Sequence, residues 1–233
     1  MTNIQENIDA VLQRIAKACN KAQRNPQAVT LLAVTKTVSP ELIKLAITAG
    51  QRHFGENYVS EGVEKIANLQ LETKEFGLVW HCIGPVQSNK TRLVAEHFDW
   101  VHSVDRLKIA QRLNDQRPLD AKPLQVCIQV NIDAGINKSG VTPDEVQTLA
   151  QEILKLPHLK WRGIMVIPEP ATDLIAAQDV NMRAKALFDS LIEQGFNLDT
   201  LSMGMSADFE AAILEGATHI RVGTELFGER ARK

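Results

Sequence analysis

Lys36 directly follows the apolar run Val29–Thr35 and is the residue of this sequence best placed for covalent chemistry. A run of this kind is typical of a buried parallel strand, so the lysine marks the point where the chain leaves the hydrophobic interior. A lysine amine that burial has freed of its proton attacks carbonyl carbons. The alternative is a lysine whose ammonium group extends to the rim of the fold and stays solvated. Lys36 is therefore a candidate nucleophile if a carbonyl compound binds beside it.

Two segments near the C-terminus combine glycine with hydroxyl groups in a way that suits a phosphate. The first is Met203–Ser206, which precedes a predicted helix, and the second is Arg221–Thr224. N–H groups at a helix start, the close approach that glycine permits and the two hydroxyls would all contact phosphate oxygens. Taken singly, Ser206 is equally an ordinary helix N-cap and Gly223 an ordinary turn residue. Taken as a pair, the two segments favour a phosphate site.

A carbonyl-reactive lysine beside a phosphate site is what pyridoxal 5′-phosphate requires, although a phosphosugar aldolase would need the same pair. Arg221 lies two residues before Gly223, so both side chains share one face of a strand. An inward arginine that faces the pyridine nitrogen would keep that nitrogen unprotonated and weaken the cofactor as an electron sink. This favours milder chemistry than transamination. The alternative is that Arg221 pairs with a buried carboxylate such as Glu56 or Glu225.

The elements that must position these residues alternate along the chain. Apolar residues at helical spacing predict a first helix over Asn3–Arg24. Strands are predicted at Val29–Thr35, His53–Gly55, Val79–Gly84, Trp100–Ser103, Gln125–Ile132, Gly163–Ile167, Thr200–Gly204 and His219–Gly223. Helices are predicted between them, from Ser39–Pro40 to Gly50 and near Tyr58–Leu69, Lys90–His97, Leu107–Asn114, Pro143–Leu154, Ala177–Gln194 and Ala207–Leu214.

Eight strands separated by helices predict a parallel sheet, and in 233 residues they favour a closed (β/α)8 TIM barrel over an open doubly wound sheet. We expect one domain over residues 1–233, with the extra helix in front. The loops after the strands form the active face of such a barrel, and phosphate often binds after strands seven and eight. Because strand eight adjoins strand one, Lys36 is expected to lie next to the phosphate loops.

Composition limits the partners and the location of the protein. A formal net charge of −2 gives no field that would attract nucleic acid or an anionic membrane. No stretch is long and apolar enough to span a bilayer, and the N-terminus lacks the apolar core of a signal peptide. The three cysteines are widely separated, and the six histidines show no ligand spacing, so neither disulfides nor a metal site is expected. The sequence therefore predicts a cytoplasmic protein. Since nothing apolar and obviously exposed demands a partner, we also expect a monomer.

Five ordered motifs give the sequence a close resemblance to the family of pyridoxal phosphate homeostasis proteins, relatives of the barrel domain of alanine racemase. The resemblance covers essentially the whole chain. The motifs are Leu32-Ala-Val-Thr-Lys-Thr37, Phe54-Gly-Glu-Asn-Tyr-Val59, His81-Cys-Ile-Gly-Pro-Val-Gln-Ser-Asn-Lys90, Leu201-Ser-Met-Gly-Met-Ser206 and Arg221-Val-Gly-Thr224.

The resemblance implies a role for each motif residue in binding the cofactor. Lys36 would form the Schiff base, Asn57 would contact the ring region, and Arg221 would contact the pyridine nitrogen. The phosphate would be bound by Ser206, Gly223 and Thr224. Lys138 matches a family lysine near the site and would be a secondary acceptor of the cofactor. No catalytic residue is implied.

The family resemblance also implies a function without turnover. Such a protein would hold pyridoxal 5′-phosphate, limit its free concentration and deliver it to apoenzymes. The alternative is an amino-acid racemase, which needs acid/base groups on both faces of the substrate carbon. Alanine racemase takes its second group from an added domain, whereas this chain is expected to end after strand eight, and its only tyrosine is Tyr58. An aldolase, the third hypothesis, would carry no chromophore.

Overall fold

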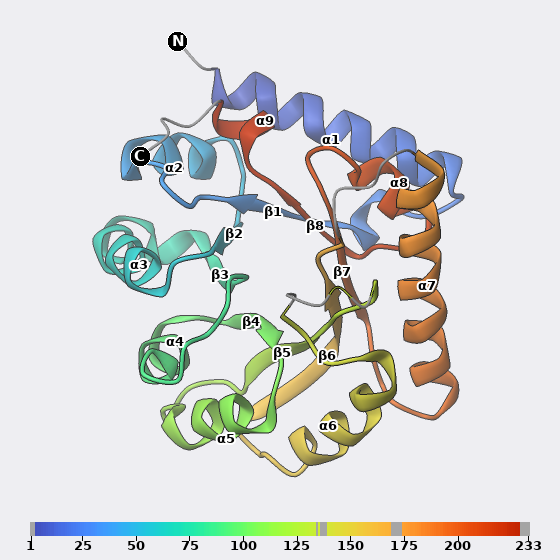
Figure 1. The fold of residues 1–233 in the computed structure, drawn as a ribbon. Helices are drawn as coiled ribbons and strands as arrows, with labels where there is room; N and C mark the ends of the chain where they lie inside the picture. Colours follow the sequence, from blue (N-terminus) through green and yellow to red (C-terminus); the bar gives the residue numbers. More distant parts are fainter. Residues whose placement is uncertain (1–2, 134, 136–138, 169–173, 229–233) are drawn as a thin grey trace.

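The computed structural model describes residues 3–133, 135, 139–168 and 174–228, and within them eight parallel strands close into a barrel surrounded by helices (Figure 1). The strands follow one another around the barrel in chain order, and β8 pairs with β1 to close it. The predicted (β/α)8 TIM barrel is confirmed.

All the predicted strands and helices are present, with shifted ends. The strands are β1 (Thr30–Val34), β2 (His53–Glu56), β3 (Val79–Cys82), β4 (Trp100–Val104), β5 (Leu124–Val130), β6 (Leu159–Val166), β7 (Thr200–Met205) and β8 (His219–Val222). The helices are α1 (Ile4–Lys21), α2 (Pro40–Thr48), α3 (Val59–Thr73), α4 (Thr91–His97), α5 (Leu107–Gln116), α6 (Val146–Ile153), α7 (Leu174–Glu193), α8 (Phe209–Leu214) and α9 (Thr224–Phe227). Short 3-10 turns are η1 (Pro26–Ala28), η2 (Lys74–Phe76) and η3 (Pro143–Glu145).

Two differences from the prediction have simple causes. Strand β6 begins four residues early, at Leu159, because its first half alternates buried Leu159 and Trp161 with exposed Lys160 and therefore lacks the apolar run of its second half. Helix α9 was not predicted, since a helix of four residues is too short to show periodicity.

The alternation of strand side chains decides which residues reach the barrel interior. In β1, Leu32 and Val34 pack with Ile83 in a small buried cluster of their own. Their neighbours Leu31 and Ala33 instead belong to the large core between the strands and the helices. Lys36 lies two residues beyond Val34, so it continues the inward series at the end of the strand.

Helix α1 packs across the outside of the barrel beside α8 and α9 (Figure 1). Its buried stripe consists of Ile4, Ile8, Val11 and Ile15, the spacing of one helix face. Asn3 caps its start by accepting the backbone N–H of Glu6. The helix therefore covers the outside of the barrel where the last two βα units lie.

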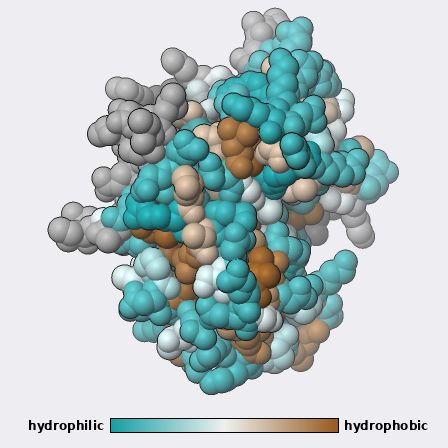
Figure 2. All heavy atoms as spheres, turned by 90° about the vertical axis from the view of Figure 1, so that its right-hand side faces the viewer, coloured by the Kyte–Doolittle hydropathy of each residue, from teal (hydrophilic) through white to brown (hydrophobic). Residues whose placement is uncertain are grey.

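Among the residues drawn in colour in Figure 2, hydrophobic groups on this face are separated by hydrophilic residues. Within the described part of the chain, no helix combines the length and apolar composition needed to cross a membrane.

Candidate functional site

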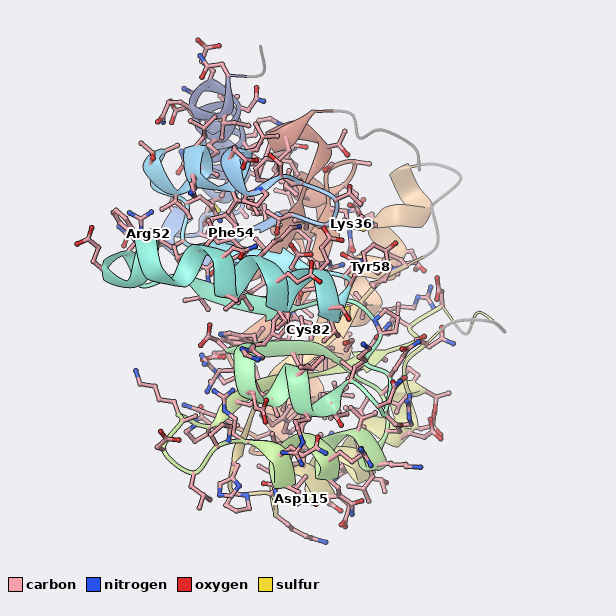
Figure 3. The ribbon with its side chains drawn as sticks, turned by 90° about the vertical axis from the view of Figure 1, so that its left-hand side faces the viewer. Lys36, Arg52, Phe54, Tyr58, Cys82 and Asp115 are labelled. Atoms are coloured by element: carbon pink, nitrogen blue, oxygen red, sulfur yellow. The ribbon has the colours of Figure 1, made fainter. Side chains whose placement is uncertain are left out.

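A pocket of about 320 Å³ lies where the C-terminal ends of the strands meet, a size within the range of small-molecule sites. The six residues predicted to form the cofactor site all line it: Lys36, Asn57, Ser206, Arg221, Gly223 and Thr224. The apolar part of the wall comes from Val34, Ile83, Ile167, Met205 and Ala207. Figure 3 shows Lys36 and Tyr58 at one end of the barrel, with Arg52 towards the other. The structure thus brings together side chains from β1, β2, β7 and β8.

Lys36 lies in a turn whose backbone is held from outside the barrel. Thr37 has φ +60°, an uncommon value for a β-branched residue. Its N–H donates to the carboxylate of Glu61 at 2.5 Å, and Lys65 donates to the same carboxylate and to the carbonyl of Thr35. The residues on both sides of Lys36 are therefore fixed by α3, which limits the freedom of the lysine backbone.

Lys65 also joins this turn to a buried carboxylate. Its Nζ lies 2.8 Å from Oε1 of Glu56, which is fully buried, and the same oxygen accepts the Thr35 hydroxyl at 2.6 Å. Burial raises the pKa of Glu56, while Lys65 opposes that rise. An ion pair of this kind is destabilised strongly when one partner is removed. It ties the end of β2 to α3, and so supports the Lys36 turn.

Arg221 points into the barrel, as its spacing from Gly223 predicted, but its partners are not carboxylates. Its guanidinium donates to the hydroxyl of Ser202 and to the carbonyl of Val166, each at 2.9 Å. Burial lowers the pKa of Arg221 to about 10, which leaves it charged at pH 7. The alternative pairing with Glu56 or Glu225 is wrong, because Glu56 binds Lys65 and Thr35 whereas Glu225 binds Arg14.

The two predicted phosphate loops lie on the same side of the pocket, with one correction. Helix α8 begins at Phe209, and its N-cap is Asp208 rather than Ser206. The Asp208 carboxylate accepts the backbone N–H of Met205 at 2.7 Å and so folds the turn that contains Ser206. Thr224 is the first residue of α9. The opening N–H groups of a helix have no acceptor within it, so α8 and α9 add donors near both hydroxyls.

Asn57 reaches the pocket because Gly84 lets two strand ends approach. A Cβ at Gly84 would lie 2.1 Å from the carbonyl oxygen of Asn57, so no other residue fits there. The side-chain Oδ1 of Asn57 is buried and has no hydrogen-bond partner among the described residues. Because a buried acceptor without a donor is unfavourable, this oxygen suits a donor on a bound molecule.

Arg14 of α1 links the helices that follow the two phosphate loops. It binds the carboxylate of Glu210 in α8 through two N–H groups at 2.7 and 2.8 Å, and it also pairs with Glu225 in α9. Its guanidinium lies 4.4 Å from the ring centroid of Phe209. The extra N-terminal helix therefore helps to hold both loops in register.

We predict that Arg14→Met lowers the free energy of unfolding by about 1 kcal/mol, since a two-pronged but half-exposed ion pair is worth roughly that amount. The deficit should shrink in high salt. Urea unfolding at two salt concentrations measures both effects. Lys17→Met, at an exposed position of the same helix, is the matched control. An Arg14→Met protein as stable as the parent at low salt would refute the link.

The remaining sequence predictions have separate outcomes. Tyr58 is 59% exposed and lines a neighbouring pocket rather than the one that holds Lys36. Lys138 lies outside the described residues. Sequence reasoning missed Ser202 as a partner of Arg221, although its inward position in β7 follows from strand alternation. No group of three potential metal ligands gathers within the described chain.

Comparisons with known proteins agree with this fold and place the chain in a family. The family model described as "Alanine racemase, N-terminal domain" matches residues 7–231. A pyridoxal phosphate homeostasis protein of Pseudomonas aeruginosa is 51% identical, and the match covers 99% of this chain and 97% of that protein. The corresponding Escherichia coli K12 protein is 49% identical over 99% of this chain and 98% of its own length. The structure of PipY of Synechococcus elongatus with PLP bound is 36% identical, has a TM-score of 0.78, and aligns with 94% of this chain and 100% of that one.

Proposed function

The chain belongs to the family of pyridoxal phosphate homeostasis proteins, and from this premise we propose that it binds pyridoxal 5′-phosphate in the pocket lined by Lys36 and Arg221. The observation that carries the proposal is the convergence of an amine, a buried guanidinium and two hydroxyl-bearing loops on one pocket. The PLP-containing PipY structure supports the choice of cofactor.

The residues present fit this group chemically. The cofactor would supply an aldehyde, and Lys36 would be the amine that reacts with it. Ser206, Gly223 and Thr224 would hold the phosphate, where helix-start N–H groups favour an anion. Arg221 would face the ring nitrogen, and the unpartnered Oδ1 of Asn57 would accept a hydrogen bond from the ring region. Val34 and Ile83 keep water from the inner side of the pocket.

The arrangement favours holding the cofactor over turnover. Lys36 and Arg221 are the ionisable groups among the described residues that line the pocket, and Arg221 stays charged. A racemase needs a second acid/base group opposite the lysine, and Tyr58 lies in the wall of another pocket. We therefore infer that the protein is a carrier that delivers the cofactor to apoenzymes. As the sequence analysis predicts, we further propose that residues 1–233 form one domain and that the protein is a cytoplasmic monomer.

Removing either phosphate-loop hydroxyl, in Ser206→Ala or in Thr224→Val, is expected to weaken binding of pyridoxal 5′-phosphate by about 10- to 100-fold. One hydrogen bond to a charged group contributes about 1.5–3 kcal/mol, which corresponds to that factor. Absorbance titrations with pyridoxal 5′-phosphate and with pyridoxal measure the two affinities. Binding of pyridoxal should change little, and an equal loss for both ligands would place the phosphate elsewhere.

Delivery is tested by mixing the loaded protein with an apo-aminotransferase. A scavenger of free aldehyde is added, so that any cofactor released into solution is removed. A carrier that transfers its cofactor directly still activates the apoenzyme, and it does so faster than the cofactor dissociates from the carrier. Activation that the scavenger abolishes would contradict direct delivery. Exchange of the α-proton of alanine in D₂O would favour the racemase instead.

A further inference from the structure

The interior of this barrel contains a column of polar side chains where branched aliphatic residues usually dominate. His81, His102 and Ser202 are fully buried inside it, and Arg221 is 5% exposed. His53 lies half-buried at the start of β2, at the end of the barrel opposite the pocket. These five residues come from β2, β3, β4, β7 and β8.

Hydrogen bonds join the five residues end to end. His53 Nδ1 lies 3.1 Å from His81 Nε2, and His81 Nδ1 lies 2.9 Å from His102 Nε2. His102 Nδ1 lies 2.9 Å from the Ser202 hydroxyl, which accepts a hydrogen bond from Arg221. This chain of hydrogen bonds therefore runs from the end of the barrel opposite the pocket to the guanidinium that lines the pocket.

The chemistry of its last member gives this chain a direction. A guanidinium only donates, so the Ser202 oxygen accepts from Arg221. The single proton of the Ser202 hydroxyl then has His102 Nδ1 as its acceptor within the described structure. A neutral histidine that accepts at Nδ1 carries its proton on Nε2. His102 therefore donates to His81, and His81 donates to His53.

The opposite direction would leave Ser202 with two donors and an unused proton. If His102 carried its proton on Nδ1, both His102 and Arg221 would donate to the same oxygen. The serine proton would then need a third partner in a fully buried position, which is unfavourable. Burial also lowers the pKa of His81 and of His102 well below the usual range, so both rings are neutral at pH 7.

We propose that Ser202 and His102 are positioning residues for Arg221, and that His81 and His53 complete a one-directional hydrogen-bond chain that fixes their tautomers. The Ser202 hydroxyl and the carbonyl of Val166 hold the two terminal nitrogens of Arg221, so together they determine how the guanidinium is turned. The consequence for the cofactor rests on the proposed function: a fixed Arg221 keeps the ring nitrogen unprotonated. The chain itself belongs to the protein without cofactor.

The first test is a long-range ¹H–¹⁵N correlation spectrum of the histidine rings in cofactor-free protein at pH 7.5. The expected result is a proton on Nε2 and none on Nδ1 for His53, His81 and His102. A proton on Nδ1 of His102 or His81, or a charged ring at either position, would overturn the proposal. This measurement does not depend on whether the protein binds pyridoxal 5′-phosphate.

The second test compares Ser202→Ala with Ser202→Thr, which keeps the hydroxyl. Ser202→Ala removes the source of direction, so the Nδ1–H form of His102 should appear, whereas Ser202→Thr should retain the parent tautomers. Unchanged tautomers in Ser202→Ala would overturn the proposal.

The absorbance of bound pyridoxal 5′-phosphate changes with pH, and the midpoint of this change should rise in Ser202→Ala by about 0.5–1 pH unit. A shift of this size is the effect of losing one hydrogen bond. Ser202→Thr should restore the parent midpoint. An unchanged midpoint would contradict the positioning of Arg221. A parent protein that binds no cofactor would refute the proposed function. The tautomer spectra would still show whether the hydrogen-bond chain runs in the proposed direction.

Discussion

Lys36→Ala is expected to lose the visible absorbance band of bound pyridoxal 5′-phosphate and to bind the cofactor at least ~100-fold more weakly. A hundredfold loss corresponds to about 2.7 kcal/mol, a conservative value for the loss of a covalent bond. Weak binding should remain, because the phosphate loops and Arg221 are unchanged. Absorbance and equilibrium dialysis measure the two effects on the same protein.

A further variant separates the covalent bond from the charge of Lys36, and a second one is its control. Lys36→Arg keeps the positive charge but forms no Schiff base, so its spectrum should resemble that of Lys36→Ala. Lys160→Ala, at an exposed position near the start of β6, is the matched control and should bind as the parent does. A parent-like band in Lys36→Arg would show that another amine holds the cofactor.

Acidification from pH 7.5 to 5.5 is expected to destabilise the protein by about 4 kcal/mol, a large part of the 5–15 kcal/mol typical of a folded domain. His81, His102 and His219 are buried, and desolvation lowers the pKa of each, that of His219 to about 3. In the unfolded chain they take up protons near pH 6.5. Because the folded state binds fewer protons there, stability is lost as the pH falls, by about 1.4 kcal/mol for each histidine.

Urea unfolding across this pH range measures the linkage. Glu56, whose pKa burial raises, binds protons in the folded state and makes the slope shallower. His219→Gln should remove about one third of the pH dependence, while His97→Gln, at an exposed position of α4, should leave it unchanged. A total loss of less than ~1.4 kcal/mol over the range would mean that the buried rings are protonated in the folded state.

The sequence was sufficient for the barrel and for the neighbourhood of the pocket because both follow from local patterns. Apolar runs and helical spacing located the strands, and the rule that active sites lie after the strands placed Lys36 beside the loops of β7 and β8. Asn57 was predicted from the family resemblance rather than from its chemistry. That these residues bind the cofactor stays a prediction.

What the sequence left open depends on contacts between distant strands. The partner of Arg221 could not be chosen, because Ser202 and Val166 approach it from β7 and β6 only once the barrel closes. Ser206 was given the N-cap position that Asp208 occupies, since both residue types are good caps and only the fold of the turn decides between them. The histidines looked unrelated in sequence for the same reason, although the rings of His53, His81, His102 and His219 lie in contact with one another inside the barrel.

The most direct test of the central claim is borohydride reduction of the protein loaded with one equivalent of pyridoxal 5′-phosphate, followed by peptide mass spectrometry. Reduction makes a Schiff base permanent and marks the lysine that formed it. We predict one modified site, in the peptide that contains Lys36. A modification spread over surface lysines, or confined to a lysine outside the pocket, would contradict the assignment of Lys36 as the cofactor-binding residue.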